Sequence, residues 1–203
     1  NSEIRELVTD TELKTIKNNE KYLRQISKEV DFKDKSYLDD IKLIESYFNN
    51  SLNPLFALAS VQIGIPKRII YLKNTTADMS KNADINYNEN QVLINPVIKK
   101  ELGHTRFLEM CESCLNYAAV VDRPYQIDVE YYDINGNKKC KHFEGLAATI
   151  ISHEYDHLNG ILHLDLTDNI MELEYDEVLR YRKEHPYEII SKDCKYIKAK
   201  RNE

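Results

Sequence analysis

Residues 153–163 read HEYDHLNGILH and contain the side chains that a catalytic metal site needs. If this segment is helical, His153 and His157 lie one turn apart on the same face, so both imidazoles can reach one cation. Glu154 then sits beside the ligands, where it can take a proton from a water that the metal activates. Chance produces this pattern in only about one of a few hundred chains of this length. The sequence therefore predicts a catalytic metal site.

The run before this motif, GLAATIIS at residues 145–152, places small and apolar residues at helical spacing. A helix of this composition is expected to be buried. Gly160 suits the position just after the C-terminal end of such a helix. The motif is therefore predicted to lie on a buried helix that ends before Gly160.

Two histidines do not complete the site, because a catalytic metal is usually held by three protein ligands with one position left open. One candidate is His163, since HExxHxxGxxH is the signature of the metzincin endopeptidases. Those enzymes also need a methionine turn, whereas Met171 lies in an acidic, helix-like run. The alternation of residues 161–166 favours a strand residue at position 163 that binds no metal.

A second candidate is a downstream glutamate of the thermolysin kind, Glu174 or Glu177. Acidic residues are frequent in that segment, so an exposed helix face explains them better. The third candidate is Cys114, in the segment CESCLN at residues 111–116. Cys111 is interpreted as a small buried residue near the site rather than as half of a redox pair.

Around Cys114 the chain resembles the peptide deformylases, whose second motif reads EGCLS and whose third reads HExDH, commonly continued by LNG. The matching segments here are ESCLN at residues 112–116 and HEYDHLNG at residues 153–160. Further segments that resemble the family are residues 22–30, 58–68, 94–96 and 132–136. These ordered blocks outweigh the single histidine at position 163.

The resemblance implies that Cys114, His153 and His157 bind the metal and that Glu154 is the general acid and base. The metal that the family suggests is Fe(II). The Cys-His-His ligand set would also accept zinc, nickel or cobalt, and residue types alone do not choose between them.

The resemblance also implies that the Gln62 side chain and the Leu115 backbone N–H donate to the developing oxyanion. Phe56 and Ala57 are implied as substrate-binding residues, with Phe56 at the mouth of the methionine pocket. The family's first motif usually reads GxGxAAxQ, but residues 55–62 read LFALASVQ, without either glycine. Glycine at such places permits close backbone approach to a ligand.

Ser113 replaces the glycine before the predicted metal cysteine, and the stretch that follows is short and lacks the arginine usual in the family. These departures keep open the alternative of a divergent metal-binding or peptide-binding protein with little activity. The other alternative is a metzincin-like zinc endopeptidase that uses His163. The reading that the resemblance favours is removal of the N-formyl group from N-formylmethionyl nascent polypeptides, with release of formate.

The fold that the resemblance implies is α+β, with antiparallel or mixed strands around a central buried HExxH helix and a C-terminal helix. Residues 1–203 are expected to form one catalytic domain. The implied partners are nascent peptides, with transient ribosome association.

The composition excludes other classes of function. The 34 acidic and 28 basic residues give a net charge of −6, which argues against nucleic acid as the principal partner. No apolar run approaches the roughly 18 residues that span a bilayer, so no membrane association is expected. Four unevenly spaced cysteines fit a reducing compartment. The expected location is the cytoplasm, or an organellar stroma if an N-terminal leader has been removed.

Periodicity and turn residues predict the other elements. Apolar spacing in residues 39–48 indicates an amphipathic helix, expected to pack beside the catalytic helix. Asn135 and Gly136 predict a hairpin turn. The remaining expectations are strands over residues 68–72, 91–94, 126–132 and 139–143, a surface loop over residues 73–90 and a helix over residues 167–183.

Overall fold

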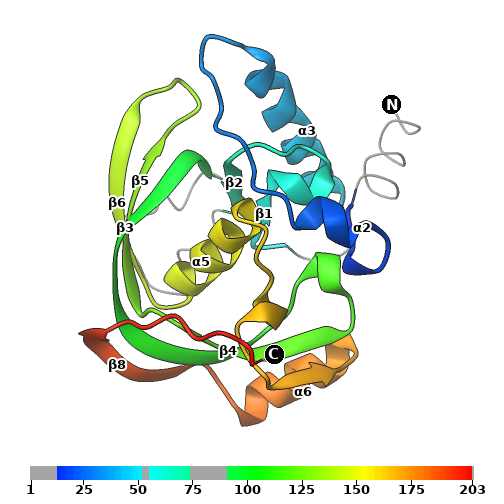
Figure 1. Ribbon diagram of the computed structural model, residues 1–203, viewed down its shortest axis with the longest axis vertical. Helices are drawn as coiled ribbons and strands as arrows, with labels where there is room; N and C mark the ends of the chain where they lie inside the picture. Colours follow the sequence, from blue (N-terminus) through cyan, green and yellow to red (C-terminus); the bar gives the residue numbers. More distant parts are fainter. Residues whose placement is uncertain (1–12, 52–54, 74–90, 203) are drawn as a thin grey trace.

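The computed structural model describes residues 13–51, 55–73 and 91–202, and its architecture is α+β (Figure 1). The expected loop over residues 73–90 lies outside the described residues except for its first position. An eight-stranded sheet with antiparallel pairing surrounds the helix α5, as the fold prediction required. The strands are β1 (Ala57–Ala59), β2 (Ile69–Leu72), β3 (Gln91–Glu109), β4 (Tyr117–Arg123), β5 (Gln126–Tyr132), β6 (Lys138–Glu144), β7 (Ile170–Glu172) and β8 (Glu188–Lys195). The helices are α2 (Ile16–Leu23), α3 (Ser36–Asn50), α5 (Leu146–Leu158) and α6 (Tyr175–Glu184), with 3-10 turns η1 (Ser60–Ile63), η2 (Glu112–Cys114) and η3 (His163–Asp165).

The long strand β3 holds the sheet together, because four other strands pair with it. Ile94 pairs with β2 and with β5, so these two strands lie along opposite edges of β3. Thr105 likewise pairs with β4 and with β8. The sequence predicted only the first four residues of β3 as a strand. Beyond them the strand is irregular, with shifts in its register to β5 between Ile94 and Val97 and between Ile98 and Lys100.

The helix α5 carries the HExxH motif through the middle of the molecule. Its residues Ala147, Ala148 and Ile151 are fully buried against strand residues such as Val129 and Phe143. Each fully buried side chain of the size of isoleucine or phenylalanine contributes roughly 1.5–3 kcal/mol. The predicted buried helix is therefore present, and its position is fixed on several sides by the sheet.

Gly160 ends the segment that carries α5, at a backbone φ of +70°. A Cβ at this position would lie 2.1 Å from the backbone oxygen of Arg24, so no larger residue fits without moving the chain. The predicted stop at Gly160 thus has two causes, the left-handed backbone and the close approach of the N-terminal segment.

The helix α3 forms where the apolar spacing predicted it, but it does not pack beside α5. Ile41 and Ile44 of α3 share a core cluster with Ile69 of β2, whereas the next residue, Ile70, packs in the α5 cluster. Neighbouring residues of a strand point to opposite faces of the sheet. The expected contact is therefore wrong, because α3 covers the face of β2 that points away from α5 (Figure 1).

The hairpin of β5 and β6 agrees with the prediction. Every residue from Gln126 to Tyr132 pairs with β6, and the two strands are joined at Asn135 and Gly136. Gly136 has a φ of +80°, a conformation that costs glycine little.

The C-terminal third differs from the expectations in three places. Residues 161–166, expected as a strand, contain the 3-10 turn η3, in which the Asp165 side chain accepts from the Leu162 N–H at 2.8 Å. The expected helix over residues 167–183 begins only at Tyr175, because Glu174 and Glu177 cap it there, and β7 precedes it on the edge of β4. The strand β8 was not predicted.

Among the described residues, every helix is too short or too polar to span a lipid bilayer.

Candidate metal centre

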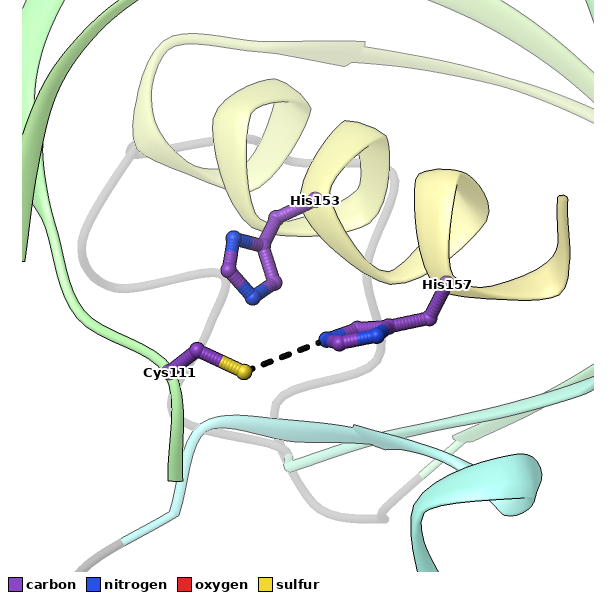
Figure 2. Close-up of side chains that lie close together, drawn as sticks. All are labelled: Cys111, His153 and His157. Carbon is purple, nitrogen blue, oxygen red and sulfur yellow. Dashed lines mark hydrogen bonds between the residues drawn. The ribbon is translucent and has the colours of Figure 1, made fainter. Parts of the chain in front are cut away.

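Three side chains converge beside α5 with donor atoms that can bind one metal ion. Their ligand atoms, from Cys111, His153 and His157, all lie within 4.8 Å of one another. Figure 2 shows the cysteine sulfur facing the histidine rings, and Cys111 Sγ is 3.3 Å from His157 Nε2. Both histidines project from α5, and Cys111 lies just before η2. The chain thus presents one thiol and two imidazoles to a common point.

The cysteine in this group is Cys111 and not the predicted Cys114. Cys114 is also buried, but it packs with Cys111 in an apolar cluster and is not among the three grouped side chains. The family motif EGCLS matches three letters of ESCLN at residues 112–116, and it equally matches three letters of EMCES at residues 109–113. The motif alone could not choose between these two placements. The geometry fits the placement at residues 109–113, in which the metal ligand is Cys111, one 3-10 turn upstream of Cys114.

Glu109 holds the ring of His153 in place. His153 Nδ1 donates to Glu109 Oε1 at 2.8 Å, which leaves Nε2 for the metal. Arg123 in turn donates to both oxygens of Glu109, at 2.8 and 2.9 Å. Burial alone would raise the pKa of Glu109, but the Arg123 guanidinium holds that pKa well below its usual range. Glu109 is therefore a carboxylate that orients the ligand His153. This role was not predicted, because the family motif was matched to residues 112–116 and not to residues 109–113.

The same arginine extends these contacts to α5 and, through Asp156, to Lys198. Arg123 Nη1 donates to Asp156 Oδ2 at 2.5 Å, and Lys198 Nζ donates to Asp156 Oδ1 at 2.5 Å. Arg123 is 1% exposed and Asp156 is 2% exposed, so these charges are screened little by water. The sequence did not predict this network, because the charged residues that form it lie on separate elements.

Glu154 occupies the position expected for a general acid and base. Its side chain is buried, Oε1 has no hydrogen-bond partner among the described residues, and this atom lies 4.0 Å from His157 Nε2. Burial raises the pKa of Glu154 to about 7, against a smaller opposing effect of His153. A carboxyl group with a pKa near neutrality can both accept and return a proton.

Gln62 reaches the centre from η1. Its Oε1 accepts from the Ala59 N–H at 3.0 Å, and its Nε2 donates to Ser113 Oγ at 3.1 Å. The same Nε2 lies 3.8 Å from Cys111 Sγ. The side-chain amide is thus fixed beside the thiol, where the resemblance implied an oxyanion donor.

The backbone N–H that follows the grouped cysteine belongs to Glu112. Leu115, to which the resemblance assigned this role, follows Cys114 instead. Both Glu112 and Leu115 line the cleft in front of the metal site. The change of cysteine therefore moves the implied donor from Leu115 to Glu112.

His163 does not join the ligand group. Its Nε2 donates to the backbone oxygen of Tyr117 at 2.9 Å, and burial lowers the pKa of this imidazole to about 3. Met171 lies in β7 and not in a turn. Glu174 and Glu177 cap α6, so the thermolysin-like candidates are also outside the group. Within the described residues, the only three-ligand group is the one with Cys111.

A cleft of about 390 Å³ opens in front of the centre. Phe56 and Ala57, the predicted substrate-binding residues, line it together with Gln62, His153 and Glu154. Ala57 lies in the extended strand β1 and is not among the described non-glycine residues with positive φ. The missing first-motif glycine is therefore accommodated without backbone strain at this position.

Comparisons with known proteins agree with this geometry. A sequence model of the family described as polypeptide deformylase matches residues 13–172. The peptide deformylase of Pelagibacter ubique is 38% identical over 149 residues, which cover 71% of this chain and 80% of that protein. The peptide deformylase of Rhizobium meliloti is 37% identical over 164 residues, 78% of this chain and 84% of that protein.

Solved structures show the same likeness. A peptide deformylase from Synechococcus elongatus in complex with actinonin has a TM-score of 0.64 and 27% identity, over 87% of this chain and 86% of that chain. The peptide deformylase of Thermotoga maritima has a TM-score of 0.63 and 25% identity, over 75% of this chain and 93% of that chain. On the sequence match and the shared fold, the chain belongs to the peptide deformylase family.

Proposed function

We propose that this chain removes the N-formyl group from formylmethionyl peptides and releases formate, with Cys111, His153 and His157 as its metal ligands. The observation that supports this most strongly is the convergence of the Cys111 sulfur with the two histidines of α5 at the wall of an apolar cleft. The likeness to the Synechococcus deformylase, which binds actinonin, also supports it.

The donor atoms fit a divalent transition metal. A thiolate and two imidazoles suit iron, zinc, nickel or cobalt, and Fe(II) is the metal that we propose. Because Glu109 occupies Nδ1 of His153, this ligand is restricted to Nε2, as in many metal sites. When bound, the cation supplies a Lewis acid that polarises the formyl carbonyl and lowers the pKa of water.

Glu154 moves the proton in this proposal. Its unpartnered Oε1 accepts a proton from the attacking water and returns it to the amine that leaves. The Gln62 side-chain amide and the Glu112 backbone N–H stabilise the negative charge that develops on the formyl oxygen. The proton carrier thus comes from α5, whereas the two oxyanion donors come from η1 and η2.

The apolar cleft binds the substrate. Phe56 lines this cleft, and in this proposal it receives the methionine side chain, while Ala57 belongs to β1, the last strand at one end of the sheet order. An extended peptide can add to such an edge by backbone hydrogen bonds. The proposed partners are nascent formylmethionyl chains, with transient contact to the ribosome in the cytoplasm.

The direct test measures formate release from formyl-Met-Ala-Ser by the Fe(II)-loaded protein under anaerobic conditions. We expect formate from this peptide and no acetate from acetyl-Met-Ala-Ser, which controls for general amidase activity. A binding protein without activity would release nothing. Cleavage between the peptide's residues would instead support the endopeptidase alternative.

A matched pair of variants tests the ligand assignment. Cys111→Ala should lower metal affinity by more than about 100-fold, because loss of a ligand costs more than loss of its supporting partner. Cys114→Ala keeps the thiol at Cys111 and should retain the metal. Competition with a chelator measures both affinities, and the opposite order would return the ligand to Cys114.

A further inference from the structure

The C-terminal tail of the chain runs back across the molecule from β8 toward β4 (Figure 1). It begins after β8, which pairs with β3, and lies beyond residue 172, the last residue matched by the family model. Further on, the Arg201 N–H donates to the Asp165 backbone oxygen at 2.8 Å and Asn202 Nδ2 donates to Asp168 Oδ2 at 2.8 Å. The tail is thus fixed at both ends, and Figure 1 shows it running from β8 to beside β4.

Between these two anchors, the ammonium group of one lysine in the tail contacts a buried carboxylate. Lys198 Nζ lies 2.5 Å from Asp156 Oδ1. The Asp156 side chain is 4% exposed, whereas 43% of the Lys198 side chain remains exposed. Asp156 lies on α5 between the two histidine ligands and His157 follows it directly. The tail therefore contacts the catalytic helix at a residue that lies between the two histidine ligands.

A continuous series of charged contacts connects Asp156 to the metal ligand His153. Arg123 bridges the carboxylates of Asp156 and Glu109, at 2.5 and 2.8 Å. Glu109 then accepts from His153 Nδ1 at 2.8 Å. Two carboxylates are thus balanced by one guanidinium and one ammonium, and without Lys198 the single guanidinium would serve both.

We propose that Lys198 is a positioning residue of the metal centre: it neutralises Asp156, so that Arg123 stays bound to Glu109 and Glu109 keeps His153 oriented. This inference rests on the proposed metal centre. Without the lysine, the uncompensated Asp156 draws Arg123 away from Glu109, and the ring of His153 is held less firmly. Metal affinity falls as a result, although Lys198 contacts neither the metal nor the substrate.

The test compares Lys198→Met, Lys198→Arg and Lys200→Met with the unmodified protein, each loaded with Co(II). Lys200 is exposed and lies in the same tail, so its replacement removes the same charge at a matched position. We expect Lys198→Met to lower Co(II) affinity by about 3–10-fold, less than the effect typical of a direct partner of a ligand. Its Co(II) absorption bands should also shift. Lys198→Arg should restore affinity, and Lys200→Met should not change it.

A double variant decides whether the lysine acts through Asp156. In an Asp156→Asn background, Lys198→Met should cause no further loss of Co(II) affinity, whereas additive losses would overturn the proposed route. Affinity and spectrum unchanged in Lys198→Met would overturn the role of Lys198 alone. If the unmodified protein binds no Co(II), the metal centre fails and this inference fails with it. Urea unfolding of each variant confirms that the measurements refer to folded protein.

Discussion

Two sets of buried polar groups lie around α5 and differ in how they are satisfied. In the first set, the unpaired side, Glu154 Oε1 and His157 Nδ1 have no hydrogen-bond partner among the described residues. In the second set, the paired side, both oxygens of Asp156 and both oxygens of Glu109 are paired. One helix therefore contributes to an incomplete polar site and to a complete one.

This difference separates positioning from reactivity. Buried charges are costly unless they are paired, so the network on the paired side holds its members in fixed positions. The groups on the unpaired side are buried without that compensation, which leaves their lone pairs and protons available to a metal and a substrate. A site that must bind precisely is supported by contacts that the substrate never touches.

The largest effect is expected from breaking the paired side. Arg123→Leu would leave two buried carboxylates without their shared cation and should lower the free energy of unfolding by about 3–5 kcal/mol. Arg106→Leu serves as control, because Arg106 pairs with Asp122 at a site where its side chain is 48% exposed. That loss should stay below about 1 kcal/mol. Equal losses in urea unfolding would remove the distinction between these two arginines.

On the unpaired side, removing the charge of Glu154 should stabilise the folded protein. The pKa of Glu154 is about 7 in the folded protein against an ordinary value of 4.5, so ionisation above pH 4.5 opposes folding. In metal-free protein, Glu154→Gln should therefore raise the free energy of unfolding by about 3 kcal/mol at pH 8 and by almost nothing at pH 4.5. The exposed Glu29→Gln is the control. A gain of equal size at both pH values would contradict the assignment.

The link between the two sides is the contact of Glu109 with His153. Glu109→Gln keeps the size of the side chain but removes its charge, so it should weaken metal affinity by about 10–100-fold. Chelator competition with Co(II) measures this loss. A metal affinity within about threefold of that of the unmodified protein would mean that His153 does not need the hydrogen bond to Glu109.

The smallest effect is expected at His163, whose ring centroid lies 5.6 Å from that of His153 but which is outside the ligand group. His163→Gln can still donate to the Tyr117 oxygen, and it should change metal affinity by less than about twofold, since the residue is not a ligand. Loss of the metal in this variant would revive the endopeptidase alternative.

Local patterns predicted the parts of the molecule that local physics decides. The buried helix α5 and the hairpin at Asn135 and Gly136 were readable because their periods and turn residues act within a few residues. The choice between Cys111 and Cys114 was not readable, because both placements of the motif match equally well. Only the direction of the side chains in space separates them.

The supporting network was invisible for a different reason. Glu109, Arg123 and Asp156 lie on β3, β4 and α5, and no spacing in the sequence brings them together. One signal was present, since Glu109 precedes Cys111 by two residues, as the glutamate of EGCLS precedes its cysteine. The start of α6 was predicted too early, because the acidic run before it resembles a helix. The first part of that run instead forms β7 and pairs with β4.

Because β8 closes one edge of β3 at Leu102–Arg106, the fold depends on residues synthesised after the other seven strands of the sheet. Pairing between segments so far apart along the chain slows folding. Until residues 188–195 have left the ribosome, that part of β3 presents unsatisfied backbone groups to other chains. A chain truncated before β8 should therefore self-associate through this exposed edge.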